Sequence, residues 1–330
     1  MIITQTPLRV SLAGGGTDVE DFYSLEGGCV ISSAIDKYIY VIVKERFDDM
    51  IYVNYSKKEI VDRVEDIEHD LVREVMKKTG VTKGVEITTL ADVPSEGTGL
   101  GSSSSVTVGL LNALYIYQGE QMTQETLASE ACEIEIDRIK KPIGKQDQYI
   151  AAYGNLRFFR FEKDGHVKIE KMNIPESTRR RLSSNLLLFY TKRTRNSEAI
   201  FLEQKNKIDE NIEYLRQIKK RAEMLKEILA SNQLDEVGRL LHESWLIKKE
   251  LASKISNREF DQIYNTAIRA GALGGKLAGA GGGGFFLFYC PREHQDSLRT
   301  ALHTLQELRF HLEIDGSKAI FNNRRHGLKE

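Results

Sequence analysis

The residues best suited to chemistry lie in a glycine- and serine-rich stretch at 94–105, PSEGTGLGSSSS, which precedes an apolar run at 106–111. Glycine lets a backbone approach a ligand with no Cβ in the way. Serines ahead of a helix supply capping oxygens and unpaired backbone N–H groups, which together with the helix dipole favour a bound anion. The stretch is therefore interpreted as a phosphate-binding loop, and the alternative is a flexible Gly/Ser linker.

Two further glycine-rich turns stand at strand boundaries near the ends of the chain. One, at 14–16, follows the alternating run 8–13, and the other, at 279–284, leads directly into an apolar strand at 285–289. The middle loop is also entered by a strand-like run, 85–90, and left by a helical pattern, which a linker does not need. Three such turns suggest loops that converge on one polyanionic ligand.

Several familiar site patterns are excluded. The run 279–284 satisfies G-x-G-x-x-G, but a dinucleotide fingerprint must open a helix, and this run opens a strand. A P-loop is excluded because Gly275-Lys276 is followed by Leu277. There is no HExxH or GxSxG pattern, and the seven histidines show no metal-ligand spacing. The three cysteines lack CxxC spacing, which argues against a disulfide framework and a structural zinc site.

The composition is that of a globular protein, with 41% hydrophobic and 29% charged residues in a chain of 330. A net charge of −1 provides no field that would steer the chain toward nucleic acid or an acidic membrane. The N-terminus does not resemble a signal peptide, and no apolar run approaches the roughly 20 residues that span a bilayer. These features predict a cytoplasmic protein of about two domains, which we place at 1–180 and 181–330.

The elements expected around the glycine turns follow from periodicity. Strands are predicted at 8–13, 29–35, 38–44, 85–90, 186–190 and 285–289, with hairpins at 156–172 and 310–321. The turn between the second and third strands is placed at Asp36-Lys37. Helices are predicted at 66–78, 103–117, 123–138, 144–153, 208–229, 234–251 and 259–270.

Three motifs in this order resemble those of the GHMP kinases, small-molecule kinases named for galactose, homoserine, mevalonate and phosphomevalonate. They are TPLRVSLAGGGTD at 6–18, the loop at 94–105 and KLAGAGGGG at 276–284. The resemblance extends over almost the whole chain. It implies an α+β fold of two domains, an N-terminal ribosomal-protein-S5-like domain and a C-terminal ferredoxin-like domain, with ATP between them.

The resemblance also implies which residues bind ATP and Mg²⁺. The cofactor residues would be Pro94, Gly97, Gly99, Leu100, Gly101, Ser102, Ser103 and Ser104. Phosphoryl transfer places negative charge on the transferred oxygens, so a metal is expected, and the family motif assigns Ser103 as its hydroxyl ligand. Its carboxylate ligand would come from Glu133-Ile-Glu135-Ile-Asp137, where spacing to the later Asp147 favours Glu135. Without the family, these carboxylates read as a solvated helix face.

Asp147 lies in PIGKQDQ at 142–148, which is similar to the family segment whose aspartate faces the acceptor hydroxyl. It is the implied general base. Arg9 aligns with the family cation that keeps this carboxylate charged and lowers the pKa of the attacking oxygen. Asp18 matches the aspartate that holds sugar hydroxyls. The remaining implied substrate residues are Gly15, Gly16, Thr17, Gly281 and Gly282.

The sequence departs from the galactokinase pattern at Gly15-Gly16, where those enzymes carry Glu-His. The missing side chains leave room for a larger or phosphorylated sugar. The motifs are most similar to the branch that phosphorylates the anomeric hydroxyl of D-glycero-D-manno-heptose 7-phosphate for surface-glycan synthesis. A substrate phosphate needs cations, for which Lys192, Arg193 and Arg195 are candidates and Lys145 a further option. Otherwise these are ordinary surface charges.

Two other functions stay open at this point. One is a fucose- or galactose-type sugar 1-kinase, and the other is a catalytically silent relative that binds sugar or ATP. The partners expected are a sugar phosphate and ATP, and neither nucleic acid nor membrane. The sequence leaves a homodimer open.

Overall fold

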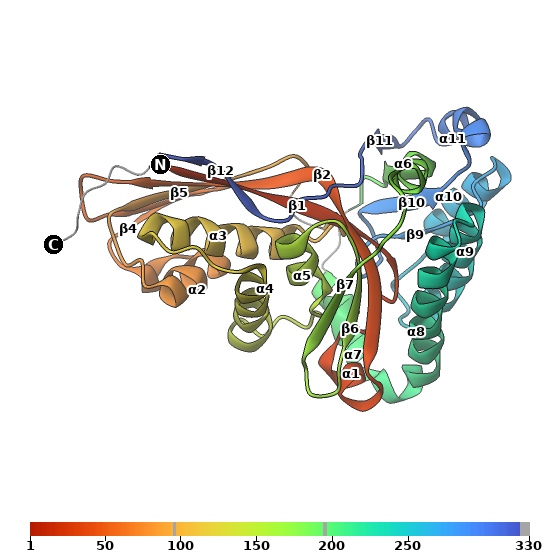
Figure 1. Ribbon diagram of the computed structural model, residues 1–330, viewed down its shortest axis with the longest axis horizontal. Coiled ribbons are helices and arrows are strands. Elements are labelled where there is room, and N and C mark those ends of the chain that lie inside the picture. The colour runs from red at the N-terminus through yellow and green to blue at the C-terminus, as the bar shows by residue number, and fades with distance from the viewer. Residues whose placement is uncertain (95–96, 194–196, 324–330) are drawn as a thin grey trace.

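The computed structural model describes residues 1–94, 97–193 and 197–323, which form two β-sheets covered by helices (Figure 1). The larger sheet has the order β12-β1-β2-β5-β3-β4, with the hairpin β6-β7 attached to β2, and the smaller has the order β11-β8-β10-β9. The strands are β1 (Ile2–Ala13), β2 (Gly28–Glu45), β3 (Ile51–Asn54), β4 (Lys58–Val61), β5 (Val85–Ala91), β6 (Leu156–Phe161), β7 (Val167–Lys171), β8 (Leu186–Tyr190), β9 (Gly274–Leu277), β10 (Phe285–Tyr289), β11 (Gln306–Leu308) and β12 (Lys318–Asn322). This arrangement confirms the predicted α+β class.

β1 and β2 are the long strands on which the larger sheet is built. The prediction of two strands joined by a turn at Asp36-Lys37 is wrong, because β2 continues through these residues. The pairing register shifts there, opposite Pro7 and Leu8 of β1, so the two polar residues form a bulge. The Asp36 N–H donates to the carbonyl of His311, and its carboxylate accepts from the His311 N–H. Polar residues can therefore remain within one strand.

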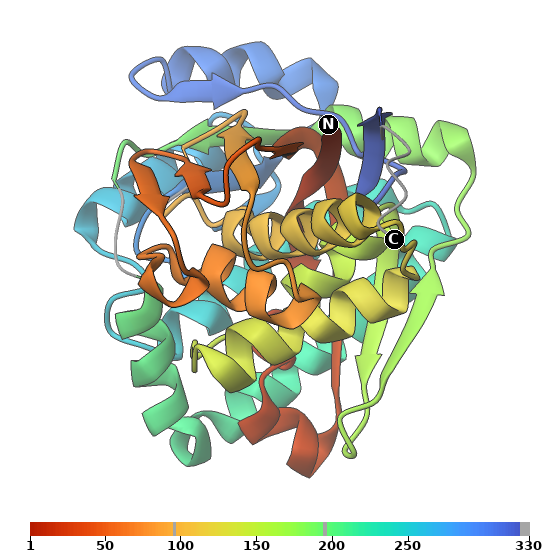
Figure 2. The same ribbon diagram turned by 90° about the vertical axis from the view of Figure 1, so that its left-hand side faces the viewer.

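A layer of helices covers one face of the larger sheet (Figures 1 and 2). It comprises α2 (Asp70–Thr79), α3 (Ser102–Gln118), α4 (Gln124–Cys132), the π-helix η2 (Glu133–Arg138) and α5 (Gln146–Tyr153). α3 is buried from Ser104 to Tyr115, since β1 and β2 cover one side and α2, α4 and α5 the other. One helix was predicted over 123–138, but the α-helix ends at Cys132 and continues as a π-helix.

The smaller sheet packs against helices from the second half of the chain. They include α9 (Leu234–Glu250), α10 (Arg258–Arg269) and α11 (Gln295–Ala301), whereas α8 (Ile208–Ala230) packs against α9 and against β1 and β2 of the larger sheet. The α-helices of the described ranges are completed by α1 (Glu20–Glu26), α6 (Glu176–Asn185) and α7 (Ser197–Asn206). Aromatic side chains of β10 and α9 form much of this core: Phe286 stacks on Phe288, with ring centroids 5.2 Å apart, and meets Trp245 edge to face. β9 and β10 are anchored in this core, and the glycine-rich turn 279–284 connects them.

The end of the chain returns to the larger sheet. The predicted pairing of 310–314 with 318–321 is wrong, since β12 pairs antiparallel with β1 and Leu312 forms only an isolated bridge with Ile35. β12 covers the edge of β1 that β2 leaves open, so the first sheet is completed by a segment of the second half. The division at residue 180 stays a prediction; it falls inside α6.

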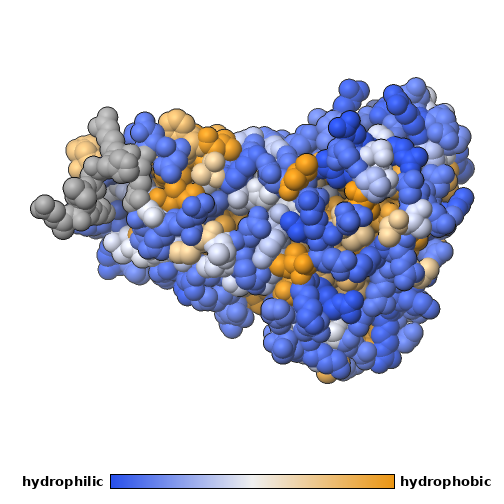
Figure 3. Space-filling view, in the orientation of Figure 1, coloured by the Kyte–Doolittle hydropathy of each residue, from blue (hydrophilic) through white to orange (hydrophobic). Residues whose placement is uncertain are grey.

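The face shown in Figure 3 is mainly hydrophilic, with scattered apolar patches. In the described part of the chain, no helix has both the length and the apolar character that crossing a membrane requires.

Candidate active site

The three glycine-rich turns meet where β1, α3 and the β9–β10 turn come together. Gly97, Gly99 and Gly101 have positive φ angles of 67°, 76° and 80°. A Cβ on Gly99 would lie 2.5 Å from the carbonyl oxygen of Ala278, and one on Gly284 would lie 2.3 Å from that of Thr98. The middle and third turns therefore pack backbone against backbone, which only glycine permits.

The first motif joins the same cluster through the backbone of Arg9, whose N–H donates to the carbonyl of Leu100 at 3.0 Å. The turns surround a cleft of about 1100 Å³. Of the residues predicted for the site, those that line this cleft are Arg9, Gly15, Gly16, Asp18, Gly97, Gly99, Gly101, Ser102, Ser103, Ser104, Asp147 and Gly281. The predicted convergence of the three turns is thus confirmed.

Other predicted residues lie beside the cleft without lining it. Thr17 is buried, and its hydroxyl lies 2.8 Å from the carbonyl oxygen of Gly14 and 2.9 Å from that of Cys29 and accepts from the Cys29 N–H, so it fixes the first turn. The side chain of Leu100 is also buried. The backbone N–H of Gly282 donates to the carbonyl of Ile255. Pro94 is exposed, next to residues outside the described range.

Arg9 and Asp147 form a two-pronged ion pair inside the cleft. Nε and Nη2 of Arg9 each donate to one carboxylate oxygen of Asp147 at 2.7 Å, and Nη1 donates to the carbonyl of Gly99 at 2.5 Å. The arginine side chain is 6% exposed and the aspartate side chain 23%. Such a fork fixes a carboxylate in one orientation, and here it leaves the carboxylate accessible from the cleft.

A second polar cluster surrounds Glu135, whose side chain is 0% exposed. Ser103 Oγ donates to its Oε1 at 2.5 Å, while Ser104 Oγ and Gln148 Nε2 both donate to Oε2 at 2.6 Å. The Lys141 ammonium lies 2.7 Å from Ser103 Oγ and 3.4 Å from Glu135 Oε1. The π-helix, a form often found at functional sites, carries Glu135 to this point opposite the start of α3.

These residues fit a hard cation. Carboxylate and hydroxyl oxygens are ligands that Mg²⁺ accepts, and Mg²⁺ commonly takes few protein ligands and completes its shell with phosphate and water. The Lys141 ammonium already lies beside the oxygens of Ser103 and Glu135, so positive charge is favoured at this position. A metal there would displace that ammonium. Over the described ranges, no group of three His, Cys, Asp or Glu residues is placed to hold a metal ion, so a metal in the cleft would also need ligands from the phosphates or from water.

Asp18 is held rigidly at the other end of the cleft. Its carboxylate accepts from the N–H of Gly16 at 2.9 Å and from the N–H of Gln146 at 3.2 Å. Burial raises the pKa of Asp18, and the neighbouring Asp147 carboxylate adds to the rise. Gly144 packs directly against Asp18, since a Cβ on it would lie 2.1 Å from Oδ2. The Asp18 carboxylate is therefore held in place by two backbone N–H groups and by the close packing of Gly144.

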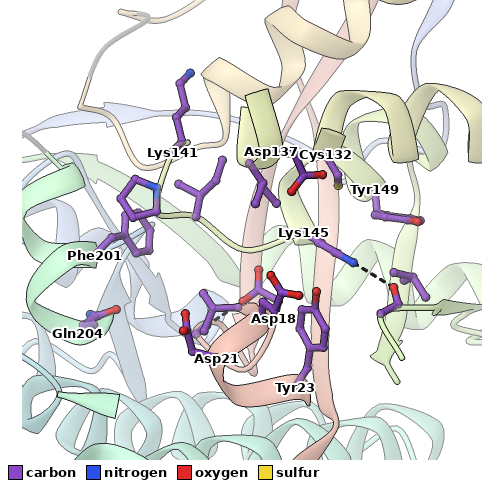
Figure 4. Close-up of a pocket in the computed structure, with 18 of the residues that line it drawn as sticks. Asp18, Asp21, Tyr23, Cys132, Asp137, Lys141, Lys145, Tyr149, Phe201 and Gln204 are labelled. Atoms are coloured by element: carbon purple, nitrogen blue, oxygen red, sulfur yellow. Dashed lines mark hydrogen bonds between the residues drawn. The ribbon is translucent and has the colours of Figure 1, made fainter. Parts of the chain in front are cut away.

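A second cavity, of about 480 Å³, shares Asp18 and Lys141 with the cleft (Figure 4). Lys145 points away from the cleft here: its ammonium donates to the Gly165 carbonyl at 3.0 Å and lies 4.9 Å from the centre of the Tyr23 ring. Carboxylates outnumber cations in its lining, which contains Asp18, Glu20, Asp21, Glu125, Glu133, Asp137 and Asp164 against Lys141 and Lys145. This cavity favours uncharged hydroxyl groups over a phosphate.

The basic residues after β8 do not enter the cleft. The Arg193 side chain is 62% exposed and pairs with Glu259 at 3.4 Å. Neither Arg193 nor Lys192 lines the cleft, and Arg195 lies outside the described residues. The assignment of Arg193 to a substrate phosphate stays a prediction that no described contact supports.

Four polar residues of the site were given no role by the sequence: Lys141, Gln148, Lys248 and Lys276. Gln148 is the residue after Asp147 on α5, and its position next to a predicted catalytic residue was the sequence signal that it belongs to the site. Lys276 is the first residue of the third motif, and a lysine at that position indicates a functional role. Nothing in the amphipathic pattern of α9 distinguishes Lys248 from Lys249.

Comparisons with known proteins agree with this geometry. The model for the GHMP kinases N terminal domain matches residues 67–155, and that for GHMP kinases C terminal matches 224–307. The D-glycero-alpha-D-manno-heptose 7-phosphate kinase of Campylobacter jejuni is 32% identical over 322 residues, covering 92% of this chain and 94% of that protein.

Solved structures show the same fold. A D-glycero-D-manno-heptose 1-phosphate kinase from Bacteroides thetaiotaomicron has a TM-score of 0.82 at 25% identity and covers 98% of this chain and 100% of that one. Lactococcus lactis galactokinase has a TM-score of 0.76 at 18% identity, covering 97% of this chain and 95% of that one.

The chain belongs to the GHMP kinase family. It is a GHMP-family sugar kinase, in a class of phosphotransferases that act on sugar and alcohol hydroxyls with ATP and typically Mg²⁺. The predicted family and its two-domain fold are confirmed.

Proposed function

We propose that this protein transfers the γ-phosphoryl group of ATP, with Mg²⁺, to the anomeric hydroxyl of D-glycero-D-manno-heptose 7-phosphate in the cytoplasm. The observation that carries the proposal is the forked Arg9–Asp147 pair, which lies in the cleft between the glycine loop and Asp18. The similarity to the Campylobacter jejuni heptose kinase over almost its whole length supports the choice of sugar.

In the proposed reaction, Asp147 accepts the proton of the acceptor hydroxyl as that oxygen attacks. Arg9 holds the carboxylate in place, and its charge stabilises the negative charge that develops nearby. The backbone N–H groups of the loop 97–103 at the start of α3 face the phosphates of ATP. Mg²⁺, held by Ser103 and Glu135, would neutralise charge on the transferred phosphate oxygens.

The acceptor sugar would be held by Asp18. Its carboxylate is fixed by two backbone N–H groups, so its outer face presents acceptor lone pairs to sugar hydroxyls. Gly15 and Gly16 add no side chains at the cleft wall, which leaves room for a sugar longer than a hexose. The carboxylate-rich second cavity behind Asp18 suits the hydroxyls of such a sugar. The phosphate of the sugar would then bind to cations outside this cavity.

Substitution of Gly144 by alanine tests the role of Asp18. The new Cβ would overlap the Asp18 carboxylate, so that carboxylate must shift from its present hydrogen bonds. We expect KM for the acceptor sugar to rise by at least about tenfold, equivalent to roughly 1.4 kcal/mol of lost binding. KM for ATP, measured in the same steady-state assay, serves as the internal control and should be unchanged. An unaltered acceptor KM would show that Asp18 does not hold the sugar.

The acceptor itself is identified by ADP release from a panel of sugars. D-glycero-D-manno-heptose 7-phosphate should give the highest kcat/KM, and ³¹P NMR should show the new phosphate on the anomeric oxygen. Unphosphorylated heptose, galactose, fucose and mevalonate are the comparison substrates. If any of these gives a higher kcat/KM, that compound and not the heptose phosphate is the preferred substrate. Binding of sugar without turnover of any acceptor would instead indicate a silent relative.

A further inference from the structure

Two lysines of the cleft have no acidic partner. Lys248, on α9, and Lys276, on β9, both line the cleft beside Arg9. In the described part of the chain, no carboxylate lies within 4.0 Å of either ammonium group, the distance that defines an ion pair. Buried charges in folded proteins are normally paired, so two unpaired lysines in one cleft need an explanation.

The lysines are held by backbone carbonyls rather than by charge. Lys248 Nζ donates to the carbonyls of Leu277 at 3.0 Å and Gly279 at 2.5 Å, which brings it next to the strand that carries Lys276. The nearest described acceptor of Lys276 Nζ is the carbonyl of Leu12, at 3.4 Å. Both ammonium groups therefore retain donor capacity that the protein does not use.

The cluster is electrostatically unfavourable while it contains no anion. Burial and, to a lesser extent, the nearby Arg9 lower the pKa of Lys276 to about 7, against a smaller opposite effect of Asp18. Burial also lowers the pKa of Lys248 well below its ordinary value, and Lys276 and Arg9 add to that effect. The carboxylate of Asp147 does not offset this repulsion by pairing with either lysine, because its described ion-pair partner is Arg9. A bound dianion would relieve it for both lysines.

We propose that Lys248 and Lys276 together bind a terminal phosphate group in the cleft. This group is either the terminal phosphate of ATP or the phosphate that the acceptor sugar carries, and the second source rests on the proposed function. The proposal places a phosphate site on α9 and β9 and not at the exposed Arg193, which does not line the cleft. It also agrees with the acidic second cavity, which would repel the same group.

The test replaces each lysine singly by methionine, which keeps the length of the side chain and removes its charge. Lys249→Met is the matched control, because Lys249 is the next residue on α9 but pairs with Asp261 outside the cleft. Affinities for ATP and ADP are measured by calorimetry. The kcat/KM values for a phosphorylated sugar and for its unphosphorylated form are measured by ADP release.

Loss of a hydrogen bond to a charged group should lower the affinity for the ligand that it contacts by about 10- to 100-fold. If the lysines bind the terminal phosphate, Lys248→Met and Lys276→Met lose affinity for ATP but not for ADP. If they bind the sugar phosphate, nucleotide affinity is kept and the preference for the phosphorylated sugar falls. Both results support the site. Variants that match the Lys249→Met control for all these ligands overturn it.

Inorganic phosphate gives a readout that does not depend on the identity of the substrate. At constant ionic strength, phosphate should raise the Tm of the unmodified protein more than that of Lys248→Met or Lys276→Met, because the general stabilisation by phosphate salts acts on all three proteins alike. Lys248→Arg and Lys276→Arg, which keep the charge, should retain most of this shift. An absence of any phosphate effect on the unmodified protein contradicts the proposal, even if the sugar proves to be a different one.

Discussion

Replacement of Asp147 by asparagine is expected to lower kcat by about 10²- to 10⁴-fold, the usual contribution of a positioned general base. Asparagine has nearly the same shape but cannot accept the proton of the attacking hydroxyl. The geometry makes this a sensitive position, because both carboxylate oxygens are fixed by Arg9 at 2.7 Å and the group faces the cleft. Single-turnover kinetics with saturating ATP and acceptor would measure the chemical step directly.

The control must separate lost chemistry from the loss of an arginine–aspartate pair. Asp48→Asn provides it, because Arg46 donates to Asp48 through the same fork, at 2.8 and 2.7 Å, and neither residue lines the cleft. That variant should keep its kcat. Asp147→Asn should also keep its affinity for ATP, because Asp147 is assigned no contact with the nucleotide. A kcat near the unmodified value would show that Arg9 and Asp147 serve the fold or the positioning of substrate, and not proton transfer.

The sequence was most informative where local conformation depends on one kind of residue. The glycines at 97, 99 and 101 predicted a tight loop, and the structure has a positive φ at each of them. Strands of β-branched and aromatic residues on either side of these loops lie close to their predicted positions. The meeting of the three turns was predicted from their equivalent positions at strand boundaries, and the middle and third turns meet where Gly99 packs against the backbone of Ala278.

Features that depend on distant segments were not predictable in this way. Asp36 and Lys37 resemble a turn locally, yet the C-terminal segment at His311 satisfies Asp36 and keeps β2 continuous. The pairing of β12 with β1 joins residues more than 300 positions apart, such as Ile2 and Asn322. A local pattern contains no information about such a partner, so a hairpin at 310–321 was the nearest available interpretation.

The charged residues of the site also differ in whether a local motif or only tertiary packing places them there. Arg9, Asp18 and Asp147 are tied to motifs, so their common location could be anticipated. Lys248 lies on a helix whose pattern is that of an ordinary amphipathic surface, and only the tertiary packing turns its ammonium toward the carbonyl of Leu277. Arg193 shows the opposite case, since its basic neighbourhood suggested a phosphate site and the fold leaves it largely exposed.

The metal assignment leads to a second large effect, for Glu135→Gln. If Glu135 is a ligand of Mg²⁺, its replacement by a neutral amide should raise the Mg²⁺ concentration needed for half-maximal activity by more than about tenfold, since even outer-shell partners of metals contribute 10- to 100-fold. Lys141 should respond in the opposite sense. Its ammonium competes for the oxygens of Ser103 and Glu135, so Lys141→Met should lower the Mg²⁺ requirement. Activity is titrated with Mg²⁺ at saturating ATP and acceptor.

Glu133→Gln is the matched control, because Glu133 lies on the same π-helix but pairs with Lys78 and Arg138 outside the cleft cluster. Its Mg²⁺ titration should be that of the unmodified protein. A purely structural Glu135 would behave differently: it accepts from Ser103, Ser104 and Gln148 in a buried site, so its replacement would lower the Tm and leave the Mg²⁺ requirement unchanged. Measuring Tm beside the titration therefore decides between a metal ligand and a buried carboxylate that only fastens η2 to α3.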